Sequence, residues 1–488
     1  MRFPPDRIVD ALKREGLLER VRGRLPESFE AIFDDSRRVA PGSLFIAIKG
    51  SIRDGHDFLE RAREKGAAAA MVEDATRTTL PCIVVREGRK AAAVAAGAAF
   101  DDPSRELRMI GITGTNGKST TAGILRHILD HPGERAASIG TLGVLLGTEA
   151  EVVPGGAELT TPGPVELQRI LRELVNRGAK TVAMEVSSHS LDQRRIDGLS
   201  FDAAVFTNLT RDHLDYHHTM EAYFEAKAKL MNYLKSDGSA AVNIDDANWG
   251  RLPDSRKKIF FGVGSHAQVR GTDVKFSPSG SEWNINHGGE SVPVKLPLIG
   301  DVNVHNALGA AAVGITFGVP LKEIAERLRR LPQVPGRLEV ISQHPTVLRD
   351  YAHTPDAIER ALAAIRPFTR GRLILVFGCG GDRDRGKRAE MGRAAEAGAD
   401  VVIITNDNPR TEDPEQILDD IEKGMTRGNH ARIVKRKSAI HQALQEANHD
   451  DVVLLAGKGH ENYQIIGTTK LPFDEKVIVR EFLSGTPA

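Results

Sequence analysis

Short runs of β-branched and aliphatic residues alternate with helical patterns along almost the whole chain of 488 residues. The predicted strands are Leu44–Ile48, Ala69–Glu73, Ile83–Val85, Met109–Thr113, Thr181–Val186, Ala203–Asn208, Leu373–Phe377, Val401–Thr405 and Val452–Ala456. The predicted helices are Ser119–Leu129, Val165–Arg177, Thr219–Leu234 and Leu321–Arg330. Such an alternation predicts an α/β protein, because helices that follow strands return the chain to parallel sheets.

Two clusters of turn-forming residues predict three domains. Asp101–Ser104 precedes a strand that looks buried, and Leu331–Gly336 ends a helix with two prolines and a glycine. The resulting domains are 1–104, 105–333 and 334–488. Within the second domain, Gln268–Leu296 alternates polar and apolar residues, which predicts an inserted antiparallel ribbon.

Composition excludes several classes of protein. Lysine plus arginine and aspartate plus glutamate both number 66, and aromatic residues number only 24, so we expect no nucleic-acid partner. The two cysteines, Cys82 and Cys379, fit a reducing compartment. No apolar run approaches the ~18 residues of a membrane span, and the N-terminus has no signal core. We therefore expect a cytoplasmic protein without membrane insertion.

The segment Met109–Thr120 predicts a phosphate-binding site. A buried strand leads into a glycine-rich turn, and a helix begins at Lys118 and Ser119. Backbone amides, the helix N-terminus and the lysine attract a polyphosphate, and the serine hydroxyl can hold Mg²⁺. The strict P-loop pattern fails, since its first glycine would fall on Ile112, and an ordinary strand-to-helix turn is the alternative. The residues expected around ATP are Gly114, Thr115, Asn116, Gly117, Lys118, Ser119 and Thr120.

Two further strand ends carry polar groups. Glu185 ends one predicted strand, and Asp212 and His213 follow the next. Carboxyl ends of parallel strands meet at one sheet edge, so these groups would lie near the phosphate loop. The alternative is a polar loop with solvated histidines.

Lys227 falls within an apolar helical stripe, whereas Lys229 points to the opposite side. An inward lysine must extend its amine to solvent, pair with an acid or be chemically altered. The sequence leaves these three possibilities open.

Four segments together resemble the Mur ligases: Gly111–Thr120, Glu185–His189, Thr207–Asp215 and Gly300–Asn306. The resemblance covers essentially the whole chain. It implies a UDP-sugar-binding N-terminal domain, a central P-loop mononucleotide-binding domain and a C-terminal Rossmann-like domain that binds an amino acid. It also implies the reaction: ATP phosphorylates a carboxylate, and an amine then attacks the acyl phosphate to form an amide.

The resemblance implies roles for residues at the reaction centre. Lys118, His213 and Lys227 would be catalytic, with Lys227 carbamylated. Magnesium would be held by Ser119, Glu185, His213 and the carbamylated Lys227. Further ATP contacts would come from Asn303, Asn306, Arg337 and Asp350.

The resemblance also implies where the other two substrates bind. The UDP-N-acetylmuramoyl-dipeptide would contact Ser36, Thr160, Thr161, Ser187, Gln193, Arg195 and Lys227. The turn Asp407–Arg410 resembles that of enzymes that take meso-2,6-diaminopimelate, whose distal carboxylate, absent from lysine, would pair with Arg410. The remaining contacts would be Arg383, Asp407, Asn408, Gly457 and Glu461.

Two other functions are weighed against an amide ligase of this kind. A folylpolyglutamate synthetase would share the ATP loop, but the UDP-type N-terminal domain and the Asp407–Arg410 turn disfavour it. A P-loop switch or motor is disfavoured because the chain has no guanine-specific pattern and no basic track for a polymer. We expect small-molecule substrates only, and a monomer.

Overall fold

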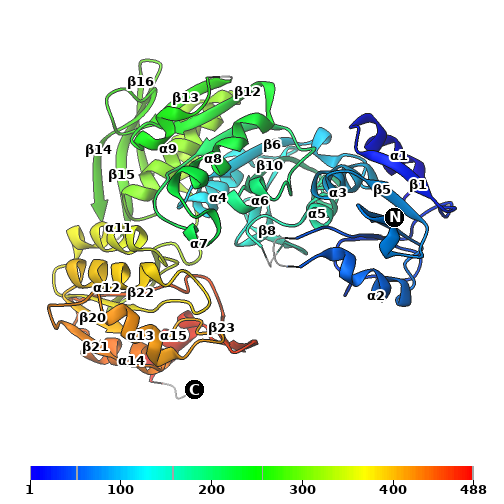
Figure 1. Cartoon of the computed structure of the whole chain (residues 1–488). Helices are drawn as coiled ribbons and strands as arrows, with labels where there is room; N and C mark the ends of the chain where they lie inside the picture. The colour runs from blue at the N-terminus through cyan, green and yellow to red at the C-terminus, as the bar shows by residue number, and fades with distance from the viewer. Residues whose placement is uncertain (1, 51–52, 157–158, 255, 278, 486–488) are drawn as a thin grey trace.

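The structure is a computed structural model that describes residues 2–50, 53–156, 159–254, 256–277 and 279–485 (Figure 1). It is an α/β protein built on three main sheets, which include strands within residues 18–85, 108–296 and 339–456. We refer to these parts as the N-terminal, central and C-terminal units. No helix in the described ranges is long and apolar enough to cross a membrane.

The N-terminal unit holds a five-stranded sheet with helices on both faces. Its strands, in spatial order, are β1 (Leu18–Arg22), β5 (Cys82–Val85), β4 (Ala69–Val72), β3 (Leu44–Ile46) and β2 (Ile32–Phe33). Only β1 runs antiparallel to its neighbour. Helices α1 (Pro5–Arg14) and α3 (Gly88–Ala99) cover one face, and α2 (Leu59–Glu64) covers the other.

The central unit holds an eleven-stranded sheet in which β6 (Arg108–Thr113) lies between β10 (Ala179–Glu185) and β11 (Phe201–Phe206). The parallel part continues through β7 (Arg135–Gly140) on one side and through β12 (Leu234–Asn243) and β13 (Lys257–Gly262) on the other. Beyond β7 lie the antiparallel strands β8 (Gly143–Leu146) and β9 (Glu151–Val153). Beyond β13 lies the predicted ribbon, formed by β14 (Val269–Ser277), β15 (Gly280–His287) and β16 (Glu290–Leu296).

Two apolar cores fix this sheet between helices. One core contains side chains of α4 (Lys118–Leu129), α9 (Asp301–Thr316) and α10 (Leu321–Arg329). The other contains side chains of α5 (Pro164–Asn176), α6 (Ser188–Asp192) and α8 (Met220–Ala228). Because β6, β10 and β11 are adjacent and parallel, their carboxyl ends open onto one edge of the sheet.

The helix predicted over Thr219–Leu234 is shorter in the structure. Thr219 caps α8 through its side chain, and α8 ends at Ala228. A 3₁₀ turn, Lys229–Tyr233, follows, and Leu234 already belongs to β12. The apolar residues of this turn continue the helical spacing, which is why periodicity alone extends the helix too far.

The C-terminal unit holds a six-stranded sheet. Its order is β17 (Glu339–Gln343), β18 (Thr346–Asp350), β22 (Val452–Ala456), β19 (Leu373–Phe377), β20 (Val401–Ile404) and β21 (His430–Arg432), with only β17 antiparallel. Helices α11 (Pro355–Ile365), α12 (Gly386–Gly398) and α13 (Pro414–Glu422) cover one face, while α14 (Arg436–Glu446) and α15 (Glu475–Ser484) cover the other. A separate hairpin, β23 (Tyr463–Ile466) and β24 (Thr469–Pro472), projects beyond the sheet.

Candidate active site

The loop between β6 and α4 is a tight glycine turn. Gly114 and Gly117 have φ values of 148° and 86°, which side chains rarely adopt. At Gly117 a Cβ would also collide with the amide of Asn306, so the turn can approach α9 only without a side chain. Lys118 folds back over this turn, and its Nζ donates hydrogen bonds of 2.8 Å to the carbonyls of Gly114 and Thr115. Burial lowers the pKa of Lys118, against the raising effect of the Glu185 and Asp212 charges.

Glu185 lies at the end of β10, 2% exposed, beside the phosphate loop. Its carboxylate accepts hydrogen bonds from the backbone N–H and the hydroxyl of Thr141, at 2.8 and 3.2 Å. It packs directly against Gly140, where a Cβ would overlap its carboxylate. The site therefore depends on the last glycine of β7 and on the threonine after it, which sequence reasoning did not select.

His213 lies at the start of α7 (Leu214–His217) in a left-handed conformation, with φ of 54°. Its ring lies 4.8 Å, centroid to centroid, from that of His189, and its Nε2 lies 3.2 Å from the carboxylate of Asp212. Burial lowers the pKa of His213 to about 3, which outweighs the raising effect of Asp212. Its neutral imidazole leaves a ring nitrogen able to bind a metal.

Lys227 is 1% exposed, so its amine does not reach solvent. Its Nζ donates one hydrogen bond, 2.7 Å long, to the carbonyl of Gly114 in the phosphate loop, and lies 4.5 Å from the ring centre of Tyr223. Burial and the nearby charge of Lys118 hold the pKa of Lys227 well below its ordinary value. Among the described residues no carboxylate forms an ion pair with it.

Asn303 and Asn306 lie in the first turns of α9, which packs against α4. Asn306 donates to the side-chain oxygen of Asn303 at 3.2 Å and accepts from the hydroxyl of Thr121 at 3.3 Å. The structure therefore brings both asparagines to the back of the phosphate loop.

The C-terminal unit closes over this loop. Arg337 donates a 3.1 Å hydrogen bond to the hydroxyl of Ser119, and its guanidinium lies over the ring of Tyr351 at 4.6 Å. Asp350, at the end of β18, accepts hydrogen bonds from the amides of Leu338 and Ala352, both 2.7 Å long. The resulting cavity, about 210 Å³, is lined by residues of the phosphate loop, Glu185, His213, Asn303, Asn306, Arg337 and Asp350.

A second cluster adjoins Glu185. The hydroxyl of Thr161 donates to the Glu185 carbonyl at 2.9 Å and accepts from the amide of Ser187 at 3.0 Å. Arg195 donates to the carbonyl of Thr161 at 3.0 Å and to the side chain of Gln193. Thr160 lies 3.3 Å, oxygen to oxygen, from Thr141. Burial lowers the pKa of Arg195, which forms no ion pair within the part of the chain that the structure describes.

Ser36 lies apart from that cluster. It is buried in the loop after β2, in the N-terminal unit. Nearby in this loop, Arg38 forms a 3.2 Å ion pair with Glu166 of α5, so the loop adjoins the central unit. The structure therefore places Ser36 near the border between the two units.

A third cluster gathers at the ends of β20 and β22. Asn408 donates to Glu461 at 2.9 Å and accepts from Lys458 at 3.0 Å. Lys458 is completely buried and also lies 3.2 Å from Glu461 and 3.7 Å from Asp407. Gly457 has a φ of 111° and packs against Asp407, where a Cβ would collide. Sequence reasoning missed Lys458, although its position directly after a buried strand was a signal.

The guanidinium groups of Arg383 and Arg410 border this third cluster. Arg410 adopts a left-handed conformation with φ of 53° and donates to the carbonyl of Gly381 at 2.7 Å. Within the described ranges neither arginine has an acidic partner in an ion pair. Burial and the charge of Arg383 lower the pKa of Arg410. Two cations are thus held beside the carboxylates of Asp407 and Glu461.

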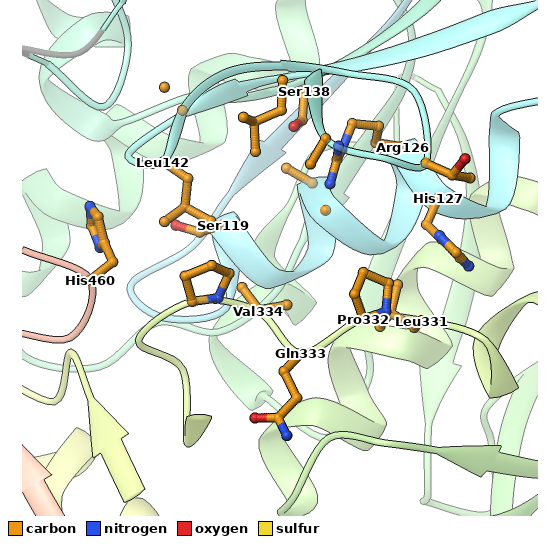
Figure 2. Close-up of a pocket in the computed structure, with 18 of the residues that line it drawn as sticks. Ser119, Arg126, His127, Ser138, Leu142, Leu331, Pro332, Gln333, Val334 and His460 are labelled. Atoms are coloured by element: carbon orange, nitrogen blue, oxygen red, sulfur yellow. The ribbon is translucent and has the colours of Figure 1, made fainter. Parts of the chain in front are cut away.

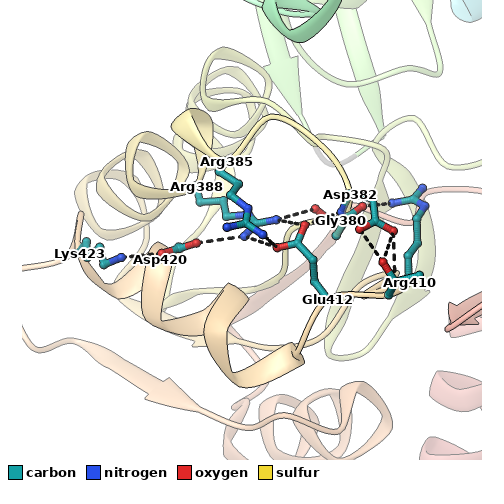
Figure 3. A network of polar contacts seen from close by, with 10 residues as sticks. Gly380, Asp382, Arg385, Arg388, Arg410, Glu412, Asp420 and Lys423 are labelled. Carbon is teal, nitrogen blue, oxygen red and sulfur yellow. Dashed lines mark hydrogen bonds and ion pairs between the residues drawn. The ribbon is translucent and has the colours of Figure 1, made fainter. Parts of the chain in front are cut away.

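A buried ion-pair network holds this region in place (Figure 3). Arg388 is completely buried and contacts Glu412 at 2.9 Å and Asp420 at 3.0 Å. Glu412 in turn accepts a hydrogen bond from the amide of Asp382, whose carboxylate accepts from Thr411, the residue after Arg410. The network therefore ties the Asp382–Arg383 turn to the Arg410 turn.

The cavity over the phosphate loop is connected to the third cluster. The amide of Gly457 donates a 3.0 Å hydrogen bond to the carbonyl of Asp350, and the side chain of Asp350 lines the cavity over the phosphate loop. A cation-rich phosphate site and a zwitterionic cluster therefore adjoin each other through the end of one strand.

No three His, Cys, Asp or Glu side chains in the described residues are grouped closely enough to hold a metal ion. Magnesium does not require such a cage, because it is commonly held by one or two protein oxygens together with phosphates and water. The Glu185 carboxylate and the Ser119 hydroxyl, both at the cavity, fit that demand.

Comparison with known proteins places the chain in a family. Residues 29–111 match the Mur ligase family catalytic domain, residues 112–314 the Mur ligase middle domain, and residues 336–459 the Mur ligase glutamate ligase domain. The chain belongs to the Mur ligase family. A Mur ligase of Synechococcus elongatus, named UDP-N-acetylmuramoyl-L-alanyl-D-glutamate–2,6-diaminopimelate ligase, is 45% identical over 458 residues, 91% of each chain.

Two further relatives carry the same name. Ligase 1 of Clostridium acetobutylicum is 40% identical over 473 residues, which is 95% of this chain and 97% of that protein. A solved structure of such a ligase is 34% identical, covers 96% of this chain and 97% of its own, and superposes with a TM-score of 0.66. These Mur ligases match the chain across all three units.

Proposed function

We propose that the protein is an ATP-dependent amide ligase that joins meso-2,6-diaminopimelate to UDP-N-acetylmuramoyl-L-alanyl-D-glutamate in peptidoglycan precursor synthesis. The observation that carries the proposal is the junction at Asp350. There the phosphate cavity adjoins a cluster of two carboxylates and two arginines that form no ion pair with any described residue. The shared name of relatives at 40 and 45% identity supports the choice of substrates.

The first step forms an acyl phosphate. An oxygen of the dipeptide's terminal carboxylate attacks the γ-phosphorus of ATP, the bond to the β-phosphate oxygen breaks, and ADP leaves. Lys118 and Arg337, which both line the cavity, would offset the repulsion between two anions. Magnesium, held by Ser119 and Glu185, would neutralise charge on the phosphate oxygens when bound, and His213 would hold a second metal ion.

The second step forms the amide. The amine of diaminopimelate attacks the carbonyl carbon, inorganic phosphate leaves, and the nitrogen loses a proton. Arg410, assisted by Asn408 and Arg383, would hold the distal carboxylate, and Asp407, Glu461 and Gly457 would hold the ammonium end. Lysine lacks that carboxylate, so it would leave Arg410 without a partner.

Lys227 is proposed to react with CO₂ and become a carbamate. The neutral amine attacks the carbon of CO₂, one proton is released, and an anion replaces a lysine that has no acidic partner. The new carboxylate-like group would lie beside the loop at Gly114, where a second metal and the dipeptide are expected.

The remaining contacts follow the geometry of the second cluster. Thr160, Thr161, Ser187, Gln193 and Arg195 would hold the dipeptide portion, and Ser36 the uridine. Asn303 and Asn306 would reach the adenine side of ATP. Because the reaction uses ATP and a UDP-linked precursor, we propose that the enzyme acts in the cytoplasm. We also propose that it is a monomer.

Phosphate release from the purified protein tests the proposal. Turnover should require ATP, Mg²⁺, the UDP-linked dipeptide and diaminopimelate together, and the product should contain one new amide. Equal turnover with lysine would contradict the amino-acid assignment. Release of phosphate without any carboxylate substrate would contradict the ligase assignment itself.

A further inference from the structure

A second, larger cavity of about 600 Å³ lies behind the phosphate loop (Figure 2). It is bounded by α4, the β7–β8 hairpin, and the linker between the central and C-terminal units. Apolar side chains dominate its wall, among them Ala122, Leu142, Leu145, Leu331 and Val334. A cavity of this size suits a small organic ligand, since such sites span roughly 300–1,000 Å³.

One buried cation interrupts this apolar wall, whereas Arg330, which also lines the cavity, is exposed and paired with Glu326 at 2.6 Å. Arg126, on α4, is 6% exposed, and its guanidinium extends toward Ser138 within the cavity (Figure 2). One nitrogen donates a 2.7 Å hydrogen bond to the carbonyl of Gly147, while the buried Nε has no partner. Within the described ranges Arg126 forms no ion pair with any carboxylate. The ring nitrogen Nδ1 of His127, beside it, is also buried without a partner.

The acids around Arg126 are engaged elsewhere or face solvent. Asp130 accepts hydrogen bonds from the amides of Ala136 and Thr148, at 2.9 and 3.0 Å. Glu149, on the cavity rim, is exposed, and Glu185, at its far end, is bonded to Thr141. Burying a guanidinium without a counter-ion costs free energy, so a ligand with one negative charge would be stabilised in this cavity.

We propose that this cavity, which shares Ser119 and Glu185 with the phosphate site, is a further ligand site, centred on Arg126, for an amphipathic monocarboxylate. The carboxylate would pair with Arg126 and offset the free-energy cost of burying its charge. The apolar body of the ligand would lie against Leu142, Leu145 and Val334. Arg126 is the buried cation of the cavity, and Glu149 and Glu185 also line it, so the site fits one negative charge better than the two of a phosphate group.

The site also touches the hinge between units. Leu331–Pro335, which connect α10 to the turn of Arg337, line the cavity, and so does His460 of the C-terminal unit. An occupant would contact both sides of this connection. Binding there is therefore a means of biasing how the C-terminal unit closes over Ser119.

The test compares an acid with its neutral analogue on the full-length protein. Calorimetric titration with 4-phenylbutyrate and with 4-phenyl-1-butanol should show at least tenfold tighter binding of the acid. Arg126→Met should remove that preference. Arg329→Met, which deletes an exposed, ion-paired arginine outside the cavity, is the matched control and should leave it unchanged.

Three results would overturn the proposal: no binding of the acid at 10 mM (about 3 kcal/mol in affinity), equal affinity for acid and alcohol, or an unchanged preference in the Arg126→Met variant. The comparison on the unmodified protein does not depend on whether that variant folds. Both titrations omit ATP and peptide substrates, so their outcome is independent of the ligase assignment.

Discussion

Replacing Arg410 by methionine removes a guanidinium that lies near Asp407 and Glu461 and forms no ion pair with any residue that the structure describes. Among those residues it donates one hydrogen bond, 2.7 Å long, to the carbonyl of Gly381, which leaves most of the group available to a ligand carboxylate. Methionine has a side chain of similar length. Both residues carry a Cβ, so the substitution leaves the backbone strain of the left-handed conformation at this position unchanged. The change therefore tests charge recognition more than backbone geometry.

The expected loss follows from the partial burial of Arg410. Removing one partner of a buried, hydrogen-bonded charge pair costs about 2–5 kcal/mol, and solvent access to this side chain favours the lower part of that range. A loss of about 2–3 kcal/mol corresponds to about a 30- to 150-fold weaker apparent affinity for diaminopimelate. Lysine has no distal carboxylate to pair with Arg410. The turnover of lysine, which we expect to be much weaker than that of diaminopimelate, should therefore hardly change in the Arg410→Met variant.

The assay is phosphate release at saturating ATP and dipeptide, with diaminopimelate varied. Arg385→Met is the control, because Arg385 lies nearby but is exposed and ion-paired with Glu412 at 2.9 Å. A change in KM below threefold for Arg410→Met would refute the role of Arg410. So would an equal loss with lysine, since that would indicate general damage to the site.

Three further substitutions probe the site. Lys227→Ala should abolish turnover, with partial rescue by added formate or acetate, and removal of CO₂ should slow the unmodified enzyme; insensitivity to both would exclude the carbamate. Gly140→Ala should force Glu185 out of place and lower kcat at least tenfold, with little change in KM for diaminopimelate, as steady-state kinetics would show. Lys458→Met should leave Asn408 and Glu461 without their buried cation and raise KM for diaminopimelate at least tenfold; an unchanged KM would show that the lysine does not position them.

The sequence predicts much of the fold because strand and helix periodicities are local. The glycine turn before Lys118 and the polar ends of β10 and β11 follow directly from residue order, and parallel strands deliver them to one edge. The ribbon of β14 to β16 is equally local, since its alternation and turns specify it. The end of α8 is not specified by the local pattern, because the apolar residues of the 3₁₀ turn after Ala228 continue the helical spacing.

Long-range pairings lie outside what the sequence alone contains. Thr141 bonds Glu185 across 44 residues, and Lys458 bonds Asn408 across 50, so neither partnership has a local signature. Arg126 looks like an ordinary basic residue in the last turn of a helix, where cations are favourable. Only packing shows that it is buried beside a cavity and that no carboxylate of the described residues forms an ion pair with it.

Transfer of an oxygen isotope tests the central chemical claim most directly. The terminal carboxylate of the UDP-linked dipeptide is labelled with ¹⁸O, and the inorganic phosphate released during turnover is analysed by mass spectrometry. An acyl phosphate passes one carboxylate oxygen to phosphate, so each phosphate released should carry one labelled oxygen. Amide formation accompanied by unlabelled phosphate would contradict the account.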